Sequence, residues 1–469
     1  MFLQKKKYLP LLFAFGVIVG LITLINPISN IDIVLLGLFL FTIGHVFLGD
    51  KMLLAFILIR PTLDWWRDYT LIQYHETFIN LNAALAIALI LWAPLFLYKY
   101  TKQIKKVPFV WLMTALTILM FGSSLYSHYP LTSIIESIKF VDILLLFIMS
   151  FIAIKEDIFT RKDLLTTILI SAIVPVTAGL WQLITGGGIT TFGVRGRIFG
   201  SFAHPNVFAF FLLFLLFLHT HYSTIAPTWF WKSHNKLRIA TYVMLLVLLL
   251  MTYTRAAYVG LFIFIITIGL LRYKKVLYWT IGLCAGFYLV FFPLNTFIEK
   301  NTDLSLQNVP LISRITSRNE DADSIEWRQA LVRETIPIIY RNPVFGYGYG
   351  TFPEVWEENR GERHLWDDSA EAHNDYLRLF LEIGALGLAL YIVLLGFLVY
   401  YTIHAYRYKK SNQKQYTYLV GWIVVMVAVS LTDNMLHHTP VMWLMWAWFG
   451  AAFAHEYKYV DSPNFLEHV

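Results

Sequence analysis

Long apolar runs, separated by short polar connections, recur along the whole chain. Most of these runs approach the roughly 20 residues that an α-helix needs to cross a bilayer. The pattern therefore predicts helical spans near residues 9–26, 31–48, 77–98, 107–125, 132–154, 163–185, 205–221, 237–253, 256–271, 275–293, 376–404, 415–433 and 440–455.

Basic residues concentrate in some of the connections, and the positive-inside rule assigns such connections to the cytoplasm. The basic connections are residues 99–106, 155–162, 232–238, 272–275 and 406–414. They share one side only if the short apolar piece at 52–61 also crosses, which gives about fourteen passes with both termini cytoplasmic. Arg60 and Pro61 are expected to end that piece, and a kinked or half-crossing helix is the alternative.

The composition agrees with a membrane protein. Of the 469 residues, 58% are hydrophobic and 14% are charged, whereas roughly a quarter of a soluble domain is charged. We therefore expect an all-α polytopic integral membrane protein with about 12–14 transmembrane helices. In such a protein the net charge of +7 is explained by basic connections on the cytoplasmic side, and we expect no nucleic-acid partner.

The N-terminus and the cysteine content indicate which processing and which cysteine sites to expect. The start of the chain is basic and then apolar without a small-residue cleavage site, which is typical of a retained first helix rather than a signal peptide. The single cysteine, Cys284, excludes an intramolecular disulfide and disfavours a cysteine zinc site.

One long hydrophilic segment, residues 298–375, is expected on the outer side. It divides the chain into an N-terminal helix bundle (1–297), this extracytoplasmic loop, and C-terminal transmembrane helices (376–469). Residues 323–340 have the apolar spacing of an amphipathic helix, and 342–354 form a turn region rich in glycine and aromatic residues. Such a surface suits either sugar stacking or a lid on lipid headgroups.

Arginine dominates the positive charge of this loop. A single lysine, Lys300, stands beside seven arginines, namely Arg314, Arg318, Arg328, Arg333, Arg341, Arg360 and Arg363. Arginine is preferred where a planar fork grips carboxylate or phosphate. The loop therefore indicates an anionic ligand, unless these arginines pair with the acids of the loop itself.

Three more arginines lie at the predicted outer ends of helices. These residues, Arg195, Arg197 and Arg255, oppose the positive-inside bias in connections that hold little other charge. A cation at the membrane edge is costly without a partner, so the three are candidates for an anion site. Gly196 and residues 186–188 would let the backbone approach a ligand closely. The alternative is that the arginines extend to headgroup phosphates.

His373 stands at the mouth of a predicted membrane helix. Asn374 or Asp375 is a suitable N-cap for this helix, and Arg378 and Glu382 have the spacing of an i, i+4 ion pair. The imidazole would then face the outer cavity, where Glu371 or Asp375 could orient it as a general base. The alternative is a histidine that only forms hydrogen bonds.

Taken together, four motifs resemble those of the bacterial O-antigen ligase and O-antigen polymerase superfamily. They are RGRIFGSFAHPNVFA, TYTRAAYVG, EWRQALVRETIPIIYRNPVFGYGYGTF and AHNDYLRLFLEIGALG, which cover roughly residues 190–395 in order. The most specific piece is the His-Asn pair followed by Leu377, Glu382 and Gly384.

The resemblance implies a type C membrane glycosyltransferase of lipopolysaccharide and related surface polysaccharide synthesis. Such an enzyme moves a glycan from undecaprenyl diphosphate to an acceptor hydroxyl at the periplasmic face of the bacterial inner membrane. It also implies that His373 is the loop-end histidine, that Arg197 or Arg195 and Arg255 are the arginines at the helix ends, and that Arg328 is the loop arginine.

The chemistry expected of these residues is a metal-independent, inverting displacement. His373 would take the proton of the acceptor hydroxyl, a contribution worth about 10²- to 10⁴-fold. Arg195, Arg197, Arg255 and Arg328 would bind the diphosphate in place of a metal. We expect no cofactor, and interpret residues 432–438 (TDNMLHH) as polar residues at a helix end rather than as a metal site.

Two questions stay open at this level. The acceptor is a lipid A core sugar for a ligase and a second lipid-linked repeat unit for a polymerase, and the sequence does not decide between them. A transporter or flippase of lipid-linked glycan is the alternative class. Such proteins usually show paired halves with interrupted helices, and we find no such pairing in the sequence.

Overall fold

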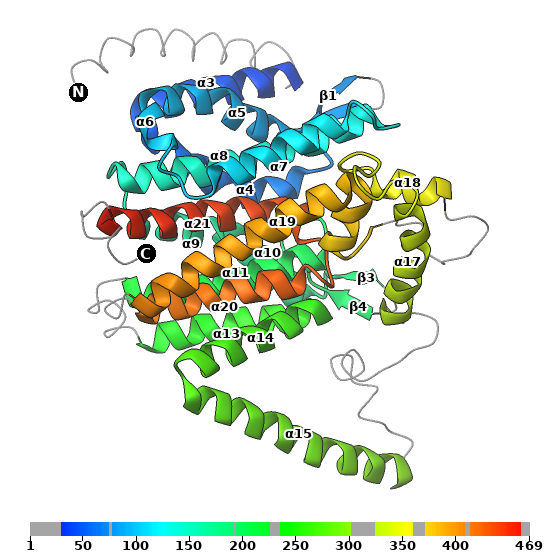
Figure 1. The fold of residues 1–469 in the computed structure, drawn as a ribbon. Helices are drawn as coiled ribbons and strands as arrows, with labels where there is room; N and C mark the ends of the chain where they lie inside the picture. The colour runs from blue at the N-terminus through cyan, green and yellow to red at the C-terminus, as the bar shows by residue number, and fades with distance from the viewer. Residues whose placement is uncertain are drawn as a thin grey trace.

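The computed structural model describes residues 30–74, 77–191, 194–225, 235–301, 324–359, 371–408 and 413–460. Helices build nearly all of this part of the chain (Figure 1). The long helices are α3 (Asn30–Leu48), α4 (Met52–Leu63), α5 (Leu81–Lys99), α7 (Val110–Ser123), α8 (Pro130–Lys155), α9 (Arg161–Ser171), α10 (Ile173–Thr185), α11 (Pro205–Ile225), α13 (Asn235–Met251), α14 (Arg255–Leu271), α15 (Lys274–Asn301), α19 (Asp375–Tyr408), α20 (Gln413–Val429) and α21 (Thr439–Val460).

Smaller elements connect these helices. They are the helices α6 (Thr101–Ile104), α17 (Ser324–Ile339) and α18 (Phe352–Asn359), the 3-10 turns η2 (Gly49–Lys51), η3 (Asp64–Trp66) and η6 (Met435–His437), and two antiparallel hairpins, β1 (Thr70–Tyr74) with β2 (Thr77–Asn80) and β3 (Ile189–Thr191) with β4 (Val194–Arg197). The all-α class is thus confirmed. The predicted span at 9–26 lies outside the described residues.

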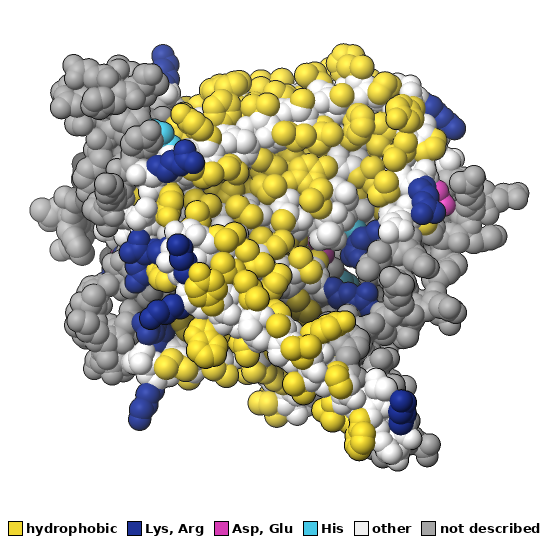
Figure 2. Space-filling model, turned by 60° about the horizontal axis from the view of Figure 1, so that its bottom comes forward, with side chains coloured by type: hydrophobic (Ala, Val, Ile, Leu, Met, Phe, Trp, Pro, Cys, Tyr) yellow, Lys and Arg dark blue, Asp and Glu magenta, His cyan; other side chains and the backbone are white. Residues whose placement is uncertain are grey.

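Several helices have the length and composition of membrane spans. Within the described residues, seven helical segments are long and apolar enough to cross a bilayer, and three shorter apolar helices accompany them. Figure 2 shows hydrophobic side chains over the middle of the surface, with Lys and Arg side chains mostly toward its left and right edges. The molecule is a polytopic membrane protein.

The predicted basic connections gather at one end of the bundle. Arg161 Nη2 donates to Gln415 Oε1 (3.4 Å), and Arg272 Nη1 donates to Gln413 Oε1 (3.2 Å). Tyr100 lies within electrostatic range of Glu156. The connections near residues 100, 156–161, 272 and 413 therefore share one end, whereas β3, β4, α17 and α18 lie at the opposite end (Figure 1).

The short helix α4 reverses the direction of α3. Asn30 Nδ2, at the start of α3, donates to Thr70 O (3.2 Å), which follows α4 and η3. At the other end of α3, Asp50 pairs with Lys99 (2.6 Å). With 12 residues, α4 is about 18 Å long, shorter than a complete span of some 30 Å. It therefore returns through the bundle as a short crossing helix.

Arg60 anchors the end of α4 inside the bundle. The helix continues past Pro61 to Leu63, so Arg60 and Pro61 do not end it as expected. The Arg60 guanidinium is buried and donates to Asp64 (2.6 Å), Asn82 (2.9 Å) and Thr439 (2.8 Å). The burial of this cation is tolerated because it has three hydrogen-bond acceptors, one of which is a carboxylate.

The centre of the bundle is built by α8 and α21, which pack side by side (Figure 1). The ring of Phe147 lies 5.8 Å from that of Trp446 and 5.3 Å from that of Phe109, centroid to centroid. Inside a membrane, where lipid tails are as apolar as the side chains, such close packing supplies much of the attraction between helices.

The helix α17 confirms the amphipathic helix predicted at 323–340. Its apolar face, which includes Leu331, Ile338 and Ile339, is buried and forms a small core with Trp356 of α18 and Leu381 of α19. Of the charged residues of α17, Arg333 is exposed. This small core attaches the hydrophilic segment to the start of α19.

A break in α19 receives the turn region that follows α17. Ile383 and Gly384 have non-helical dihedrals, and Ala385 N donates to Pro343 O (2.8 Å) across the break. Before the break, the predicted ion pair between Arg378 and Glu382 is present at 2.8 Å and is buried. The turn region and the first two turns of α19 therefore form one rigid unit.

Gly384→Ala is expected to destabilise this unit. Gly384 has φ 65° and ψ −170°, a region open essentially to glycine alone, and a Cβ would lie 2.1 Å from Val344 O. Strain of this kind costs about 1–3 kcal/mol before the clash is counted. We expect a thermal midpoint several degrees lower in detergent. Gly396→Ala is the control, since a Cβ there meets nothing within 4 Å. Equal midpoints for the two variants would contradict the argument.

Candidate active site

The β3–β4 hairpin carries Arg197 to the end of the bundle. Gly188 packs so closely on the opposite strand that a Cβ would lie 2.5 Å from Gly196 C. Gly188 thus permits a close approach of backbone to backbone, whereas a Cβ at Gly186 or Gly196 would meet nothing within 4 Å. After Arg197, Ile198 N donates to Met251 O (3.3 Å), which fixes the hairpin to the end of α13.

Arg197 is buried among acceptors from two segments, the connection before α14 and the start of α11. Its side chain donates from Nε to Thr252 O (3.0 Å) and from Nη2 to Asn206 Oδ1 (3.2 Å) and Thr254 Oγ1 (3.4 Å). The residue is 1% exposed, so its guanidinium is held rigidly. Arg197 therefore joins the hairpin to the starts of α11 and α14.

Asp433 is the buried carboxylate of the site. It accepts hydrogen bonds from Asn206 Nδ2 (2.9 Å), from its neighbour Asn434 N (2.8 Å) and from His438 Nε2 (3.2 Å). Burial alone would raise the pKa of Asp433, but the hydrogen bonds and charges of His373 and His438 outweigh it and hold the pKa well below its usual range. Asp433 is thus an anion at any working pH.

His373 faces this carboxylate. Its Nδ1 atom is buried and lies 3.9 Å from Asp433 Oδ1, while the side chain as a whole is 23% exposed. Its backbone adopts the left-handed φ of 44° just before α19 begins. Because Nδ1 faces Asp433, Nε2 on the far side of the ring is the nitrogen that can meet a substrate.

The segment around His373 is tied down by its neighbours. Asn374 caps α19, because its Oδ1 accepts hydrogen bonds from Tyr376 N and Leu377 N, both at 3.0 Å. Of the two predicted N-cap candidates, Asn374 and Asp375, the cap is therefore Asn374. Asn374 N also donates to Asn434 Oδ1 (3.2 Å), and Asn434 Nδ2 donates to Glu371 Oε2 (2.7 Å). The imidazole is therefore positioned by backbone anchored on both sides.

The carboxylate facing His373 differs from the two that were predicted. Glu371 contacts Asn434, and Asp375 accepts from Leu436 N (3.3 Å). Asp433, on the connection that follows α20, lies beside the ring instead. This contact joins the start of α19 to the connection after α20. Residues so far apart in the chain show no short spacing from which the contact could be predicted.

Arg255 is the first residue of α14 and follows the N-cap Thr254. Thr254 Oγ1 contacts both Arg197 and Asn206, so Arg255 lies one residue from this cluster. A helix N-terminus adds partial positive charge and N–H donors to the arginine. The beginning of α14 therefore suits an anion such as diphosphate.

The other predicted arginines are distributed differently. Arg328 lies on α17 and is partly buried, and the side chain of Arg195 lies outside the described residues, although its backbone belongs to β4. Arg341 donates to Asn359 (2.8 Å) and Arg333 is exposed. The remaining loop arginines lie outside the described residues, namely Arg314, Arg318, Arg360 and Arg363.

Two further histidines, His204 and His438, lie near the site. Burial, reinforced by the positive charge of Arg197, lowers the pKa of His204 to about 4. His438 is buried, bonded to Asp433 and stacked on Phe210 with ring centroids 5.3 Å apart. His373 alone of these three combines partial exposure, a carboxylate beside Nδ1 and a place at the mouth of a helix.

Residues 432–438 lie just after the end of α20, where polar residues at a helix end were predicted. They also supply Asp433, Asn434 and His438 to the site, which the sequence did not indicate. The available signal was a run of polar residues between two apolar spans. In the part of the chain that the structure describes, no group of three or more His, Cys, Asp or Glu residues is arranged to hold a metal ion.

Comparison with known families gives a match in this part of the chain. Residues 240–392 match the family model described as O-antigen ligase. The matched stretch contains Arg255, Arg328, Glu371 and His373, whereas Arg197 and Asp433 lie on either side of it. No curated protein matches the chain. On this match, residues 240–392 are similar to an O-antigen ligase domain.

Proposed function

We propose that the protein transfers a glycan from undecaprenyl diphosphate to a hydroxyl of an acceptor saccharide in the synthesis of a surface polysaccharide. The observation that carries the proposal is the linked set of Arg197, Asn206, Asp433 and His373, next to Arg255 at a helix N-terminus. It unites a candidate base and a candidate anion site. The family match supports the same class of reaction.

On the donor side, Arg255 binds the diphosphate together with the first N–H groups of α14. Donors aimed at the departing phosphate stabilise the charge that grows as the anomeric bond breaks, without a metal or other cofactor. Arg197 forms its visible contacts with the protein, so it acts by fixing Asn206 and Thr254, and it contributes positive charge to the same site. Arg195 and Arg328 are further candidates for donor contacts.

On the acceptor side, His373 Nε2 accepts the proton of the attacking hydroxyl. The hydroxyl oxygen forms the new bond to the anomeric carbon as the bond to the phosphate oxygen breaks, and undecaprenyl diphosphate leaves with the electron pair. In-line attack inverts the anomeric configuration. The negative charge of Asp433 stabilises the imidazolium that forms, while Glu371, Asn374 and Asp375 hold the surrounding backbone.

The proposed location is the bacterial inner membrane, with the site at the periplasmic face and both termini in the cytoplasm. The site lies at the end of the bundle opposite the basic connections, and the positive-inside rule assigns those connections to the cytoplasm. Lipid-linked glycans are presented at the outer leaflet, so donor and site would meet on the same side.

Asp433→Asn tests the pairing of base and carboxylate. We expect a transfer rate about 10- to 100-fold lower, because asparagine keeps the size but not the charge that stabilises protonated His373. Asp433 stays ionised across the working pH range, so the substitution removes a full negative charge beside His373. A transfer rate equal to that of the wild type would contradict the pairing.

Reconstitution of the purified protein in vesicles tests the function itself. With lipid-linked repeat units alone, a ladder of longer glycans identifies a polymerase. Product that forms only after a core glycolipid is added identifies a ligase. A flippase or other transporter would instead move the lipid-linked unit across the bilayer without forming a glycosidic bond, and that outcome would overturn the proposal.

A further inference from the structure

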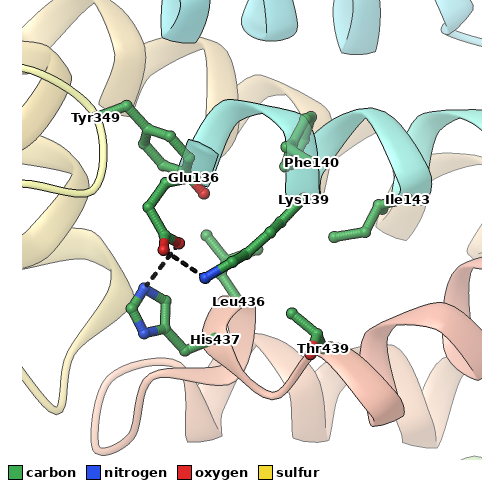
Figure 3. Close-up of a pocket in the computed structure, with 8 residues that line it drawn as sticks. All are labelled: Glu136, Lys139, Phe140, Ile143, Tyr349, Leu436, His437 and Thr439. Atoms are coloured by element: carbon green, nitrogen blue, oxygen red, sulfur yellow. Dashed lines mark hydrogen bonds and ion pairs between the residues drawn. The ribbon is translucent and has the colours of Figure 1, made fainter. Parts of the chain in front are cut away.

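A cavity of about 90 Å³ lies beside the proposed catalytic residues and takes no part in the mechanism above (Figure 3). Its walls come from α8, from the turn region before α18, and from η6 and the start of α21. The polar lining consists of Glu136, Lys139, His437 and Thr439, with the ring of Tyr349 on one side and Phe140 among the apolar walls.

The polar groups of this cavity are spaced for an inserted hydroxyl. Glu136 pairs with Lys139, and its other oxygen lies 3.9 Å from the buried His437 Nε2. His437 Nδ1 lies 3.6 Å from Glu371 Oε1. Both distances exceed the ~3.2 Å limit of a good hydrogen bond. A hydroxyl, which donates and accepts at once, can bridge such a carboxylate and imidazole.

The walls are held in place from behind. Thr439 Oγ1 accepts from the buried Arg60 Nη2 (2.8 Å), which leaves the threonine O–H free to donate to a ligand. Tyr349 N donates to Ser123 Oγ (2.8 Å), and the Arg378 guanidinium lies 5.8 Å from the centroid of the tyrosine ring. A rigid lining of this kind loses little entropy when a ligand binds.

A path of contacts links the cavity to His373. From Arg197, the hydrogen bonds lead through Asn206 to Asp433, which faces His373. From the other direction, Asn434 contacts the backbone beside His373 and binds Glu371, and Glu371 faces His437 of the cavity. In this path of contacts, His373 comes between Arg197 and the cavity.

We propose that this cavity is the acceptor subsite and receives the hydroxyl-bearing edge of the acceptor sugar. The proposal rests on the function proposed above. Carboxylate, imidazole, ammonium and hydroxyl groups around an aromatic ring suit a neutral polyol, whereas Glu136 and Glu371 repel a phosphate. A volume of this size holds about three waters, so it takes one edge of a sugar ring while the rest of the acceptor stays outside.

Acceptor kinetics of Glu136→Gln and His437→Gln test the inference. Transfer is measured in vesicles against the concentration of the acceptor identified by reconstitution, at saturating lipid-linked donor. We expect each variant to raise the acceptor KM about tenfold, since each removes a hydrogen bond with a charged or buried partner. The donor KM should stay unchanged. The matched control is Glu156→Gln, an exposed glutamate at the opposite end of the bundle.

Binding of the free acceptor oligosaccharide, without lipid or diphosphate, gives a second readout. We expect it to raise the thermal midpoint of the wild type and of Arg255→Ala but not that of Glu136→Gln. If the wild type transfers glycan while Glu136→Gln and His437→Gln keep the wild-type acceptor KM, the subsite is wrong and the function stands. If the wild type forms no glycosidic bond, the proposed function itself fails.

Discussion

Substitution of His373 by asparagine is expected to lower the rate of glycan transfer by about 10²- to 10⁴-fold, the usual contribution of a general base. Asparagine removes the basic nitrogen but tolerates the left-handed backbone that His373 adopts at φ 44°. The loss should therefore appear in kcat, with the thermal midpoint close to that of the wild type. Asp433 and the arginines stay in place, so binding of undecaprenyl diphosphate should also persist.

His128→Asn is the matched control for this experiment. His128 is exposed and lies just before α8, which starts at the same end of the bundle as the site. Its substitution should leave transfer unchanged. A His373→Asn protein that is folded and transfers glycan at the parent rate would remove His373 from the mechanism, whatever the other variants show.

Local features of the site were predictable because they follow from spacing along one segment. The Asn374 cap and the Arg378–Glu382 pair depend only on residues within two turns of one another. The amphipathic spacing of α17 similarly fixed which of its faces would be buried. In these cases the physical rule and the residues that obey it lie within a single helix.

The partners of His373 and Arg197 were not predictable in the same way. Asp433 reaches His373 because the connection after α20 packs against the start of α19, and Asp375 N bonds to Ser430 O (2.9 Å) where they meet. The β3–β4 hairpin, which carries Arg197, was likewise not predicted from the sequence. Such contacts depend on how helix ends assemble, and one sequence carries no pattern for that.

The arrangement of helix ends also explains why charged residues are stable here. Arg197, Asp433 and Asn206 are held by one another and by backbone groups at one end of an apolar bundle. A buried charge without such partners costs several kcal/mol, so the network constrains the positions of α11, α14, α19 and α20 relative to one another. Removing a member of this network should disturb the assembly, whereas removing a charge outside the network should leave it intact.

Arg255→Ala applies this distinction to the donor. We expect kcat/KM for the lipid-linked donor to fall about 10²- to 10³-fold, the usual cost of removing one donor that stabilises a developing anion. The donor kcat/KM of Arg255→Lys should lie between those of Arg255→Ala and the wild type. Lysine keeps the positive charge but lacks the planar guanidinium that binds two phosphate oxygens. Undecaprenyl diphosphate should raise the thermal midpoint of the wild type and fail to do so for Arg255→Ala.

Arg272→Ala supplies the comparison on the same helix. Arg272 follows the last residue of α14 at the opposite end, where it contacts Gln413 (3.2 Å). Its loss removes the same positive charge from the protein but none from the site, so transfer should be unaffected. If Arg255→Ala and Arg272→Ala reduce donor kcat/KM equally, the effect of Arg255→Ala is caused by the change in net charge or by a loss of stability of α14. A loss confined to Arg255→Ala, together with the lost stabilisation by undecaprenyl diphosphate, assigns it to recognition of the leaving group.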